Sequence, residues 1–519
     1  MPRPQKFHVP DGYDEGFFFA HLSDHHSIKK GRHRYRRVVI YDTFDWRLFN
    51  RSLVLYESGR RLHLRNLYED ADICSVQIAD PVVFIGDFPD SRLKELVEPV
   101  IKMRALIKLV EVSSRKAPYR IVNQHEKTVA RVEHEEIFLS RDRNRPAIAT
   151  FLWLKPVRGY LGYAREMGER LTQGGFTEKK GGDIYFSALE GADRKPGDYS
   201  TKLDVRLTPD MRPDQAAKII LRSLLHVMRV NEAHIAKDLD TEFLHDFRVA
   251  VRRTRSALRQ LKSVFPPETV RRFRKDFAFV GKLSNQLRDL DVYLLSEGTY
   301  KAMLPDGLRG DIEPLFAYLR EKRSRALREV TRSLETEKYR QILKGWDVFL
   351  REPPEAPPGA PHTGPYVIDV ARKRIYKKYR RIVKDGNAIL ENTQDEMLHR
   401  LRIQCKELRY LLEFFSSLFP PKKTSGLIEQ LKKLQDNLGD FNDFCVQEEY
   451  LLKVADELAV TDLPGKKTLV AIGSLVGTLD RKRQAAKGKF SKTFQAFASP
   501  ENSATFRELF SEKKRKSAS

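Results

Sequence analysis

Hydrophobic and polar positions change their spacing once along this chain. The first 200 residues hold short segments that are β-branched or alternate apolar and polar residues, such as 36–41, 73–78 and 129–137, with Pro and Gly between them. This pattern is typical of strands that are buried on one face. Residues 161–173 form an amphipathic stretch that ends at a Gly-Gly pair, which predicts a helix. We therefore expect an α+β or barrel-like domain over residues 1–200.

From Pro213 onward the apolar residues recur with the period of an α-helix. Proline pairs at 266–267 and 420–421 stop two of the predicted helices at matching places, because proline cannot continue a helix interior. The proline-rich stretch 352–365 predicts an extended linker between two halves, about 205–350 and 365–500, and residues 501–519 predict a basic tail. The predicted helices are 213–237, 241–264, 268–297, 311–350, 365–391, 395–418, 423–458 and 466–498.

Two of these helical segments repeat one motif. Residues 244–258 and 398–412 share the pattern His-x-x-Arg-x-x-x-Arg/Lys-x-x-Arg, and a second similar pair follows at 281–291 and 432–442. Each half therefore holds about four helices. The simplest architecture is two helical bundles related by a pseudo-two-fold axis.

Each motif places an apolar stripe beside a cationic stripe. Apolar residues recur at spacings of three and four from Leu244 and from Leu398, and the cations follow one position later. Like charges at these spacings repel by roughly 0.2–0.5 kcal/mol per pair, and a bound polyanion would reverse that sign. The second stripe has Glu413 where the first has Arg259, so we expect the first copy to contribute more binding. Protonation of the two histidines predicts tighter binding as the pH falls.

The net charge agrees with an anionic partner. Lys and Arg outnumber Asp and Glu by 95 to 71, which gives a net charge of +24. Such an excess favours nucleic acid, an anionic membrane surface or a phosphate polymer as the partner. The three cysteines are far apart, and neither a signal-peptide pattern nor an apolar run of membrane-spanning length is present in the sequence. We expect a cytoplasmic protein.

The cationic stripes have other interpretations. A charged helix face is often only solvated surface, although two matching copies make this less attractive. The histidines His245 and His399 could be metal ligands, but the flanking arginines disfavour a dication. Nucleic acid is the main competitor, and against it Tyr410 is the only aromatic residue near the stripes that could stack on a base.

The repeated motif and the segments 287–291 and 438–443 together resemble the CHAD family (conserved histidine α-helical domain) over about residues 205–500. The resemblance implies an all-α fold of two four-helix bundles that binds inorganic polyphosphate, and it raises localisation to polyphosphate granules as an expectation. The candidate polyphosphate-binding residues are His245, Arg248, Arg252, Arg253, Arg255, Arg259, Lys282, Arg288, His399, Arg402, Lys406, Arg409 and Lys433.

The N-terminal part is similar to the CYTH family, whose fold is the triphosphate tunnel. The similar segments are 41–48, 62–65, 131–135 and 152–155. The resemblance implies an antiparallel, barrel-like α+β domain.

The N-terminus departs from the CYTH pattern. CYTH enzymes open with Glu-x-Glu-x-Lys, whose carboxylates help to hold a metal; aligned on Lys6, this chain has Pro2 and Pro4 instead. Proline supplies no carboxylate, and Glu133 with Glu135 alone would make a poor site for a divalent cation. We therefore expect no catalytic residue, metal or cofactor here. At most, the tunnel would bind phosphate chains through basic residues such as Arg37, Arg65 and Lys155.

The sequence thus predicts a polyphosphate-binding protein in which a degenerate CYTH-like domain precedes a CHAD-like helical domain. Two alternatives remain open. One is an active metal-dependent triphosphatase whose helical domain recruits the substrate. The other is a nucleic-acid-binding protein.

Overall fold

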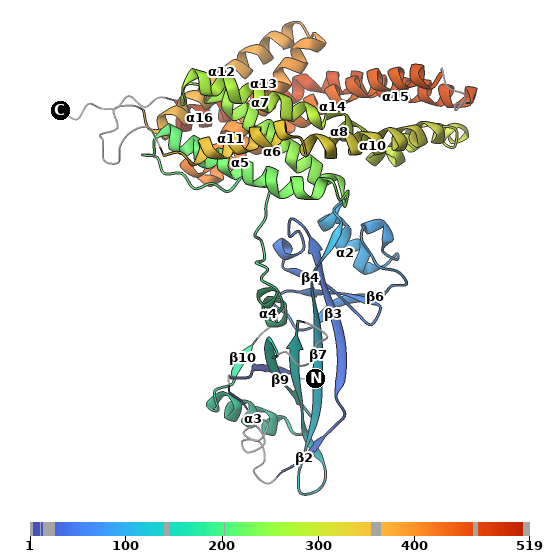
Figure 1. The fold of residues 1–519 in the computed structure, drawn as a ribbon, viewed down its shortest axis with the longest axis vertical. Helices are drawn as coiled ribbons and strands as arrows, with labels where there is room; N and C mark the ends of the chain where they lie inside the picture. Colours follow the sequence, from blue (N-terminus) through green and yellow to red (C-terminus); the bar gives the residue numbers. More distant parts are fainter. Residues whose placement is uncertain are drawn as a thin grey trace, which may run out of the picture. The chain divides into compact units, whose positions relative to one another are not determined.

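The computed structural model describes residues 4–10, 12–13, 26–139, 146–179, 181–201, 203–353, 365–459 and 465–511. The chain divides into two compact units, Met1–Thr201 and Lys202–Ser519. Figure 1 shows the first unit as strands and short helices in blue to teal, and the second as long helices in green to red. Pro2, most of the predicted linker and the basic run after Ser511 lie outside the described residues.

The N-terminal unit is built on one large antiparallel sheet. Its strands follow the order β10-β1-β9-β8-β7-β3-β4-β5-β6, and β2 pairs with β7. The helices are α2 (Arg92–Ile101), α3 (Leu161–Gln173) and α4 (Asp183–Gly191). The strands are β1 (Gln5–His8), β2 (Ser27–Lys30), β3 (Arg34–Thr43), β4 (Leu53–Ser58), β5 (Arg61–Asn66), β6 (Asp72–Gln77), β7 (Leu106–Val122), β8 (Thr128–Phe138), β9 (Ala149–Pro156) and β10 (Thr177–Lys179).

The pattern of the N-terminal sequence predicted this architecture. The expected strands at 36–41, 73–78 and 129–137 overlap β3, β6 and β8, and the expected helix at 161–173 is α3. The antiparallel, barrel-like sheet agrees with the resemblance to the CYTH fold. Because successive side chains of a strand point to opposite faces, every second residue of each strand faces the inner side of the curved sheet.

The helical unit repeats its elements in the same order. The first series is α5 (Pro213–Ile235), α6 (Thr241–Gln260), α7 (Pro267–Leu283), α8 (Asn285–Leu295), α9 (Glu297–Met303), α10 (Glu313–Leu334) and α11 (Glu337–Arg351). The second series is α12 (Val367–Glu391), α13 (Asp395–Phe414), α14 (Pro421–Ala459), α15 (Lys466–Phe497) and α16 (Pro500–Phe510). In both series the first two helices pack together, α5 on α6 and α12 on α13. Later in each series another pair packs together, α10 on α8 and α15 on α14.

The two predicted apolar stripes are the buried faces of α6 and α13. All of their members are at most 3% exposed. This burial anchors both helices in the core and fixes which face remains for the cations. The members are Leu244, Phe247, Val251, Thr254, Leu258 and Leu261 in the first stripe, and Leu398, Leu401, Cys405, Leu408, Leu412 and Phe415 in the second.

The helix boundaries differ from the prediction at three places. The predicted helix 268–297 breaks at Ser284 into α7 and α8, and the predicted helix 311–350 breaks before Thr336, whose hydroxyl accepts a hydrogen bond from the Tyr339 backbone N–H. The Thr336 hydroxyl thereby satisfies a free backbone group of α11, whereas the Ser284 hydroxyl makes no such cap and accepts a hydrogen bond from Arg248. Helix α14, in contrast, continues through the corresponding region.

The third difference is at the C-terminus, where a basic tail was expected from residue 501. Residues Pro500–Phe510 instead form α16, which begins with a Ser499 side-chain cap and a proline in its first turn. Phe506 and Phe510 are fully buried, and the Phe506 ring stacks on Tyr379 of α12. These two aromatic residues, four positions apart, mark one apolar helix face, a signal that the basic run after residue 512 obscured.

In the part of the chain that the structure describes, no helix is long and apolar enough to cross a membrane.

Candidate functional site

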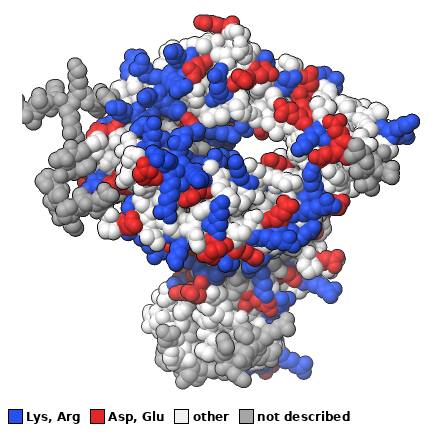
Figure 2. Space-filling view, turned by 45° about the horizontal axis from the view of Figure 1, so that its top comes forward, with Lys and Arg blue, Asp and Glu red and all other residues white. Residues whose placement is uncertain are grey.

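A cationic groove runs between α6, α7 and α13 in the helical unit. Its volume is about 1000 Å³. Nine basic side chains and one carboxylate, Glu407, line it among the described residues. Figure 2 shows Lys and Arg side chains gathered on this unit. The basic residues of the groove are Arg252, Arg255, Arg259, Lys262, Arg271, Arg274, Lys275, Arg402 and Lys406.

Helices α6 and α13 bring the two predicted cationic stripes to this one groove. Arg252 of α6 donates a hydrogen bond from Nε to the hydroxyl of Tyr410 on α13, at 2.9 Å. The neighbouring Arg253 donates from Nη2 to Glu413 Oε2 of α13, at 2.8 Å. These bonds hold the helices together where the middles of the two stripes meet. Arg252, Arg255 and Arg259 therefore face the same space as Arg402 and Lys406.

Helix α7 forms the third wall and contributes cations that the sequence analysis missed. Arg271, Arg274 and Lys275 lie at spacings of three and four, so they share one face of α7, and Lys262 precedes that helix. These residues were overlooked because they are not repeated in the second half of the chain. A Cβ atom added at Gly281 of α7 would lie 3.1 Å from Nη1 of Arg255, so the glycine leaves room for that guanidinium.

Most groove cations have no carboxylate partner in the described part of the chain. Arg259 pairs with Glu407, Arg402 pairs with Asp443 at 2.9 Å, and Arg271 pairs with the exposed Glu268. Nε of Arg402 is buried and makes no hydrogen bond to a described residue, so it is a spare donor. The remaining groove cations carry no ion pair that the structure shows: Arg252, Arg255, Lys262, Arg274, Lys275 and Lys406.

Lys406 is the most perturbed of these groups. Burial, followed by the charges of Arg402 and Arg252, lowers the pKa of Lys406 to about 8. Its ammonium group makes no hydrogen bond or ion pair that the structure shows. A half-buried cation among other cations is electrostatically costly, and a bound anion would remove that cost.

Several predicted residues lie outside the groove lining. Both motif histidines lie outside it. Nδ1 of the exposed His399 lies 2.6 Å from Asn442 Oδ1, and His245 is half-buried on α6. Arg248 donates to Ser284 and Asn285 at the break between α7 and α8, at 3.0 and 2.9 Å.

The remaining predicted residues divide into structural and exposed positions. Arg253 holds Glu413, and Nε of Arg409 lies 3.1 Å from the same carboxylate, so both brace α13. Arg288 is half-buried, and its Nη1 is buried without a hydrogen bond. Lys282 and Lys433 are exposed, and Lys433 has only the distant Glu429 carboxylate, at 3.8 Å. The structure thus places five of the thirteen predicted residues in the groove.

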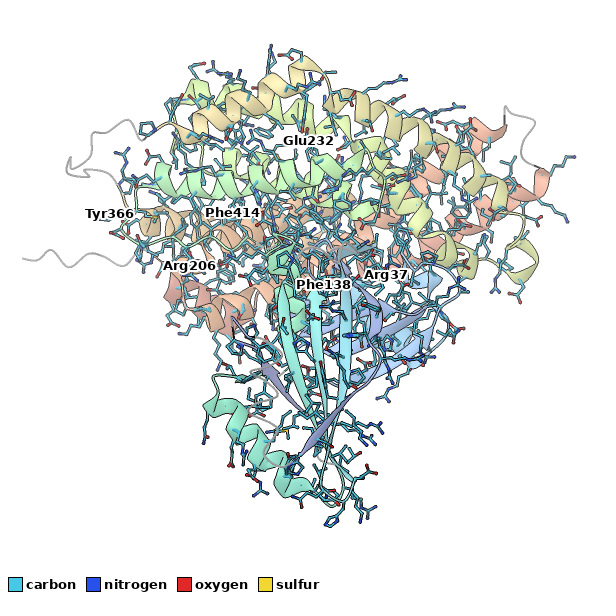
Figure 3. The ribbon with its side chains drawn as sticks, turned by 60° about the horizontal axis from the view of Figure 1, so that its bottom comes forward. Arg37, Phe138, Arg206, Glu232, Tyr366 and Phe414 are labelled. Carbon is cyan, nitrogen blue, oxygen red and sulfur yellow. The ribbon has the colours of Figure 1, made fainter. Side chains whose placement is uncertain are left out.

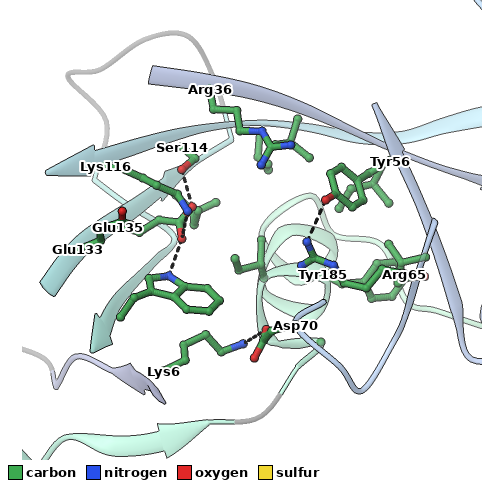
Figure 4. Close-up of a pocket in the computed structure, with 18 of the residues that line it drawn as sticks. Lys6, Arg36, Tyr56, Arg65, Asp70, Ser114, Lys116, Glu133, Glu135 and Tyr185 are labelled. Carbon is green, nitrogen blue, oxygen red and sulfur yellow. Dashed lines mark hydrogen bonds and ion pairs between the residues drawn. The ribbon is translucent and has the colours of Figure 1, made fainter. Parts of the chain in front are cut away.

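A second cavity lies on the inner face of the sheet in the N-terminal unit. Its volume is about 250 Å³, and Figure 4 shows its walls. Five basic side chains, three carboxylates and several aliphatic residues line it. The charged residues are Lys6, Arg36, Arg65, Lys116, Lys155, Asp70, Glu133 and Glu135.

Most of the charges in this cavity are paired with one another or with a carboxylate beside it. Lys6 is 2% exposed, and its Nζ lies 2.9 Å from Asp70 Oδ1 and 3.2 Å from Asp183 Oδ2. The other three pairs are Lys116 with Glu135 at 3.2 Å, Lys155 with Glu133 at 2.7 Å and Arg65 with Asp72 at 2.9 Å.

Arg65 and Lys155 line this cavity as expected, but Arg37 does not. Its guanidinium pairs with Glu111 through two bonds, at 2.6 and 2.8 Å, and it lies on the other face of β3. Arg37 and Phe138 share a register position with Ser113 and lie near each other in Figure 3. The neighbouring Arg36 faces the cavity instead, because side chains alternate along a strand.

The carboxylates expected to remain in the tunnel are already engaged by the protein. Glu135 is 4% exposed and accepts hydrogen bonds from Ser114 at 2.5 Å and from Trp153 at 2.7 Å. Pro4 and Lys6 line the same cavity. Pro4 therefore lies where the aligned CYTH motif Glu-x-Glu-x-Lys would place its second glutamate. Among the described residues, no group of three or more His, Cys, Asp or Glu side chains is arranged to hold a metal ion.

Comparison with known proteins gives relatives over part of the chain. Two uncharacterized proteins from two strains of Mycobacterium tuberculosis are 26% and 25% identical over 221 and 216 residues. Each match covers 41% of this chain and 40% of the relative, so the chain spans two fifths of the length of these curated relatives.

Two solved structures are similar to the chain at low identity. The crystal structure of the CHAD domain from the plant Ricinus communis is 22% identical, with a TM-score of 0.49, over 58% of this chain and 96% of that chain. PptA from Streptomyces chartreusis is 17% identical, with a TM-score of 0.43, over 55% of this chain and 100% of that chain.

The family comparison covers the groove itself. The CHAD domain model matches residues 219–452, which include α6, α7 and α13 and therefore every groove cation. Within the helical unit, residues 219–452 thus match the CHAD domain model.

Proposed function

We propose that the helical unit binds inorganic polyphosphate in the groove between α6, α7 and α13. The observation that carries the proposal is the charge imbalance: nine basic side chains face one carboxylate among the described residues. A row of phosphates offers charge-assisted hydrogen bonds to arginine forks and point-charge contacts to lysines. The resemblance of the repeated motif to that of the CHAD family supports the same ligand.

The extent of the groove favours a polymer over a single small anion. The groove has about 1000 Å³ of space, and its cations come from three helices and from the turn between α6 and α7. A single phosphate group would leave most of these charges uncompensated. A chain of phosphates can neutralise all three walls.

The groove walls favour polyphosphate over nucleic acid. Proteins that bind single-stranded nucleic acid stack bases on exposed aromatic rings. Tyr410 is the only aromatic residue lining this groove among the described residues; it is 3% exposed, and its hydroxyl already accepts a bond from Arg252. A base would find no open ring there.

A pair of matched double variants tests the site. Arg255→Gln with Lys406→Gln removes two groove cations that have no carboxylate partner, whereas Lys282→Gln with Lys433→Gln removes two exposed cations outside the groove lining. Both double variants lower the net charge equally. Titration with polyphosphates of graded length should show at least about a 10-fold loss of affinity for the groove pair, and little change for the outer pair. Equal losses would place the binding site elsewhere.

A competition experiment separates polyphosphate from nucleic acid. Long-chain polyphosphate should displace the protein from single-stranded DNA at far lower phosphate concentration than DNA displaces it from polyphosphate. The reverse order would favour the nucleic-acid alternative. In cells, a fluorescent fusion should gather on polyphosphate granules, and the groove double variant should not.

For the N-terminal cavity we infer that triphosphate hydrolysis has been lost. Glu133 and Glu135 each pair with a lysine, and Pro4 lines the wall where the motif of the CYTH enzymes has a carboxylate. A tripolyphosphate hydrolysis assay with Mg²⁺ or Mn²⁺ tests this inference. Robust turnover that Glu133→Ala abolishes would contradict it.

A further inference from the structure

The cavity of the N-terminal unit has an extensive aliphatic wall. Val38 of β3 lies opposite Val112 of β7, and Ile137 of β8 lies opposite Ser114, next along the same face of β7. A wall of this kind gains free energy by covering apolar surface, which a fully charged ligand cannot do. The aliphatic lining residues are Val38, Ile40, Val54, Leu67, Val112, Ile137 and Ile184.

Among the described residues, one basic group of this cavity, Arg36, has no carboxylate partner. Lys6, Arg65, Lys116 and Lys155 each have a carboxylate partner within 3.2 Å. Nε of Arg36 instead donates to the Ser58 hydroxyl at 2.5 Å, and its guanidinium carbon lies 5.7 Å from the centre of the Tyr56 ring. In the described part of the chain Arg36 has no ion pair. It is therefore the cation available to a single anionic group.

A buried hydroxyl in the same cavity also lacks a partner. Tyr185 of α4 is 5% exposed and lines the cavity, yet its hydroxyl makes no hydrogen bond to any residue that the structure describes. Leaving such a group unsatisfied costs stability, and buried polar groups are normally paired. The hydroxyl is therefore a spare donor or acceptor for a ligand.

We propose that this cavity binds a small organic anion in which one carboxylate or phosphate group is attached to an apolar body. Arg36 takes the anionic group, the aliphatic wall covers the body, and the Tyr185 hydroxyl bonds to a polar atom of the ligand. An inorganic triphosphate fits poorly, because it would face the aliphatic wall and compete with four existing ion pairs. The proposal concerns a different unit from the polyphosphate groove and does not depend on it.

The test uses the full chain carrying Arg255→Gln and Lys406→Gln, so that anions bound in the helical groove contribute little heat. Phenyl phosphate, octanoate and inorganic tripolyphosphate are compared by isothermal titration calorimetry. Binding of phenyl phosphate or octanoate at one site per chain, tighter than tripolyphosphate, supports the proposal. The two organic probes separate a phosphate head from a carboxylate head. Tighter binding of tripolyphosphate, with the same dependence on Arg36, overturns the proposal.

Neighbouring positions supply the controls. Arg36→Gln should weaken the preferred organic anion about 10-fold, the size of a charge-assisted hydrogen bond, whereas Arg37→Gln, on the other face of β3, should leave it unchanged. Tyr185→Phe should weaken binding by roughly 3-fold while leaving the melting temperature of the free protein unchanged or higher, since it removes an unsatisfied hydroxyl. If Arg36→Gln and Arg37→Gln behave alike, or if no organic probe binds the folded protein, the proposal is wrong.

Discussion

The two basic sites of this molecule differ in how many of their cations are paired with carboxylates. In the N-terminal cavity, four of the five basic side chains lie within 3.2 Å of a carboxylate. In the helical groove, nine basic side chains share one lining carboxylate, and six of the nine have no ion pair in the described part of the chain. A count of Lys and Arg in the sequence would describe both regions as basic and would not distinguish them.

This difference in ion pairing distinguishes cations that stabilise the fold from cations whose charge a bound anion could neutralise. A paired buried cation stabilises its partner, and removing it leaves an uncompensated carboxylate. An unpaired cation among other cations raises the energy of the free protein, and an anion lowers that energy on binding. Pairing, more than charge count, therefore indicates where a polyanion binds.

The largest expected effect comes from reversing charge in the groove. Arg255→Glu combined with Lys406→Glu should lower polyphosphate affinity by about 100-fold or more, since two attractive contacts become repulsive. The slope of log affinity against log salt concentration should become shallower by about two, because fewer counterions are released. Filter binding across a salt series measures both quantities. Arg36→Glu is the control in the N-terminal cavity, and an equal loss there would break the distinction between the two sites.

The next effect is on stability, where one substitution should act with opposite sign in the two sites. Lys6→Met should lower the free energy of unfolding by about 1–3 kcal/mol, because Asp70 and Asp183 lose the cation between them. Lys406→Met should leave stability unchanged or raise it by about 0.5 kcal/mol, because it removes a cation that has no carboxylate partner. Chemical denaturation of both variants measures the difference. Destabilisation by Lys406→Met would mean that this ammonium group has a structural role.

A smaller effect is expected from pH. Because burial and neighbouring arginines lower the pKa of Lys406 to about 8, the free groove loses one positive charge as the pH rises through this value. A bound polyanion favours the charged form and raises that pKa, so binding takes up a proton above pH 8. Affinity should begin to fall between pH 7 and 8, as the free lysine starts to lose its proton, and should be about 5-fold lower by pH 9.5. Lys406→Arg, which stays charged, should flatten this fall.

The same titration tests the role assigned to the histidines from the sequence. If His245 and His399 contact the polymer, affinity should rise further at acidic pH, because protonated histidines would add positive charge. Neither histidine lines the groove, so we expect this lower step to be absent. His399→Gln checks it directly.

Sequence spacing predicted the buried and the charged faces of α6 and α13, since helical periodicity alone decides which residues share a face. It could not predict which part of each stripe forms the site. That depends on where the helices meet, which is set by tertiary contacts such as the one from Arg252 to Tyr410. The N-terminal ends of both stripes, which hold the two histidines, therefore fall outside the groove lining.

Repetition was also an incomplete guide to function. It highlighted residues present in both halves and so passed over Arg271, Arg274 and Lys275, which have Ser425, Ile428 and Glu429 at the corresponding positions after the proline pairs. In the N-terminal unit the strand β3 was predicted, but Arg37 was expected to face the cavity, whereas the structure places Arg36 there. Both Arg36 and Arg37 are basic, so only the pairing of β3 with its neighbours shows which one points inward.

The smallest expected effect on binding distinguishes two adjacent arginines of α6. Arg253 was a predicted polyphosphate contact, but its side chain is only 13% exposed and bonds to Glu413 beneath the groove. Arg253→Gln should change polyphosphate affinity by less than about 2-fold while lowering the free energy of unfolding by about 1–3 kcal/mol, because the link to α13 is weakened. Arg252→Gln should do the reverse, since that guanidinium lines the groove and bonds only to a neutral hydroxyl. If Arg253→Gln proved the more damaging to binding in a folded protein, cation pairing would not separate structural from ligand-binding residues here, and the contrast between the two sites would lose its basis.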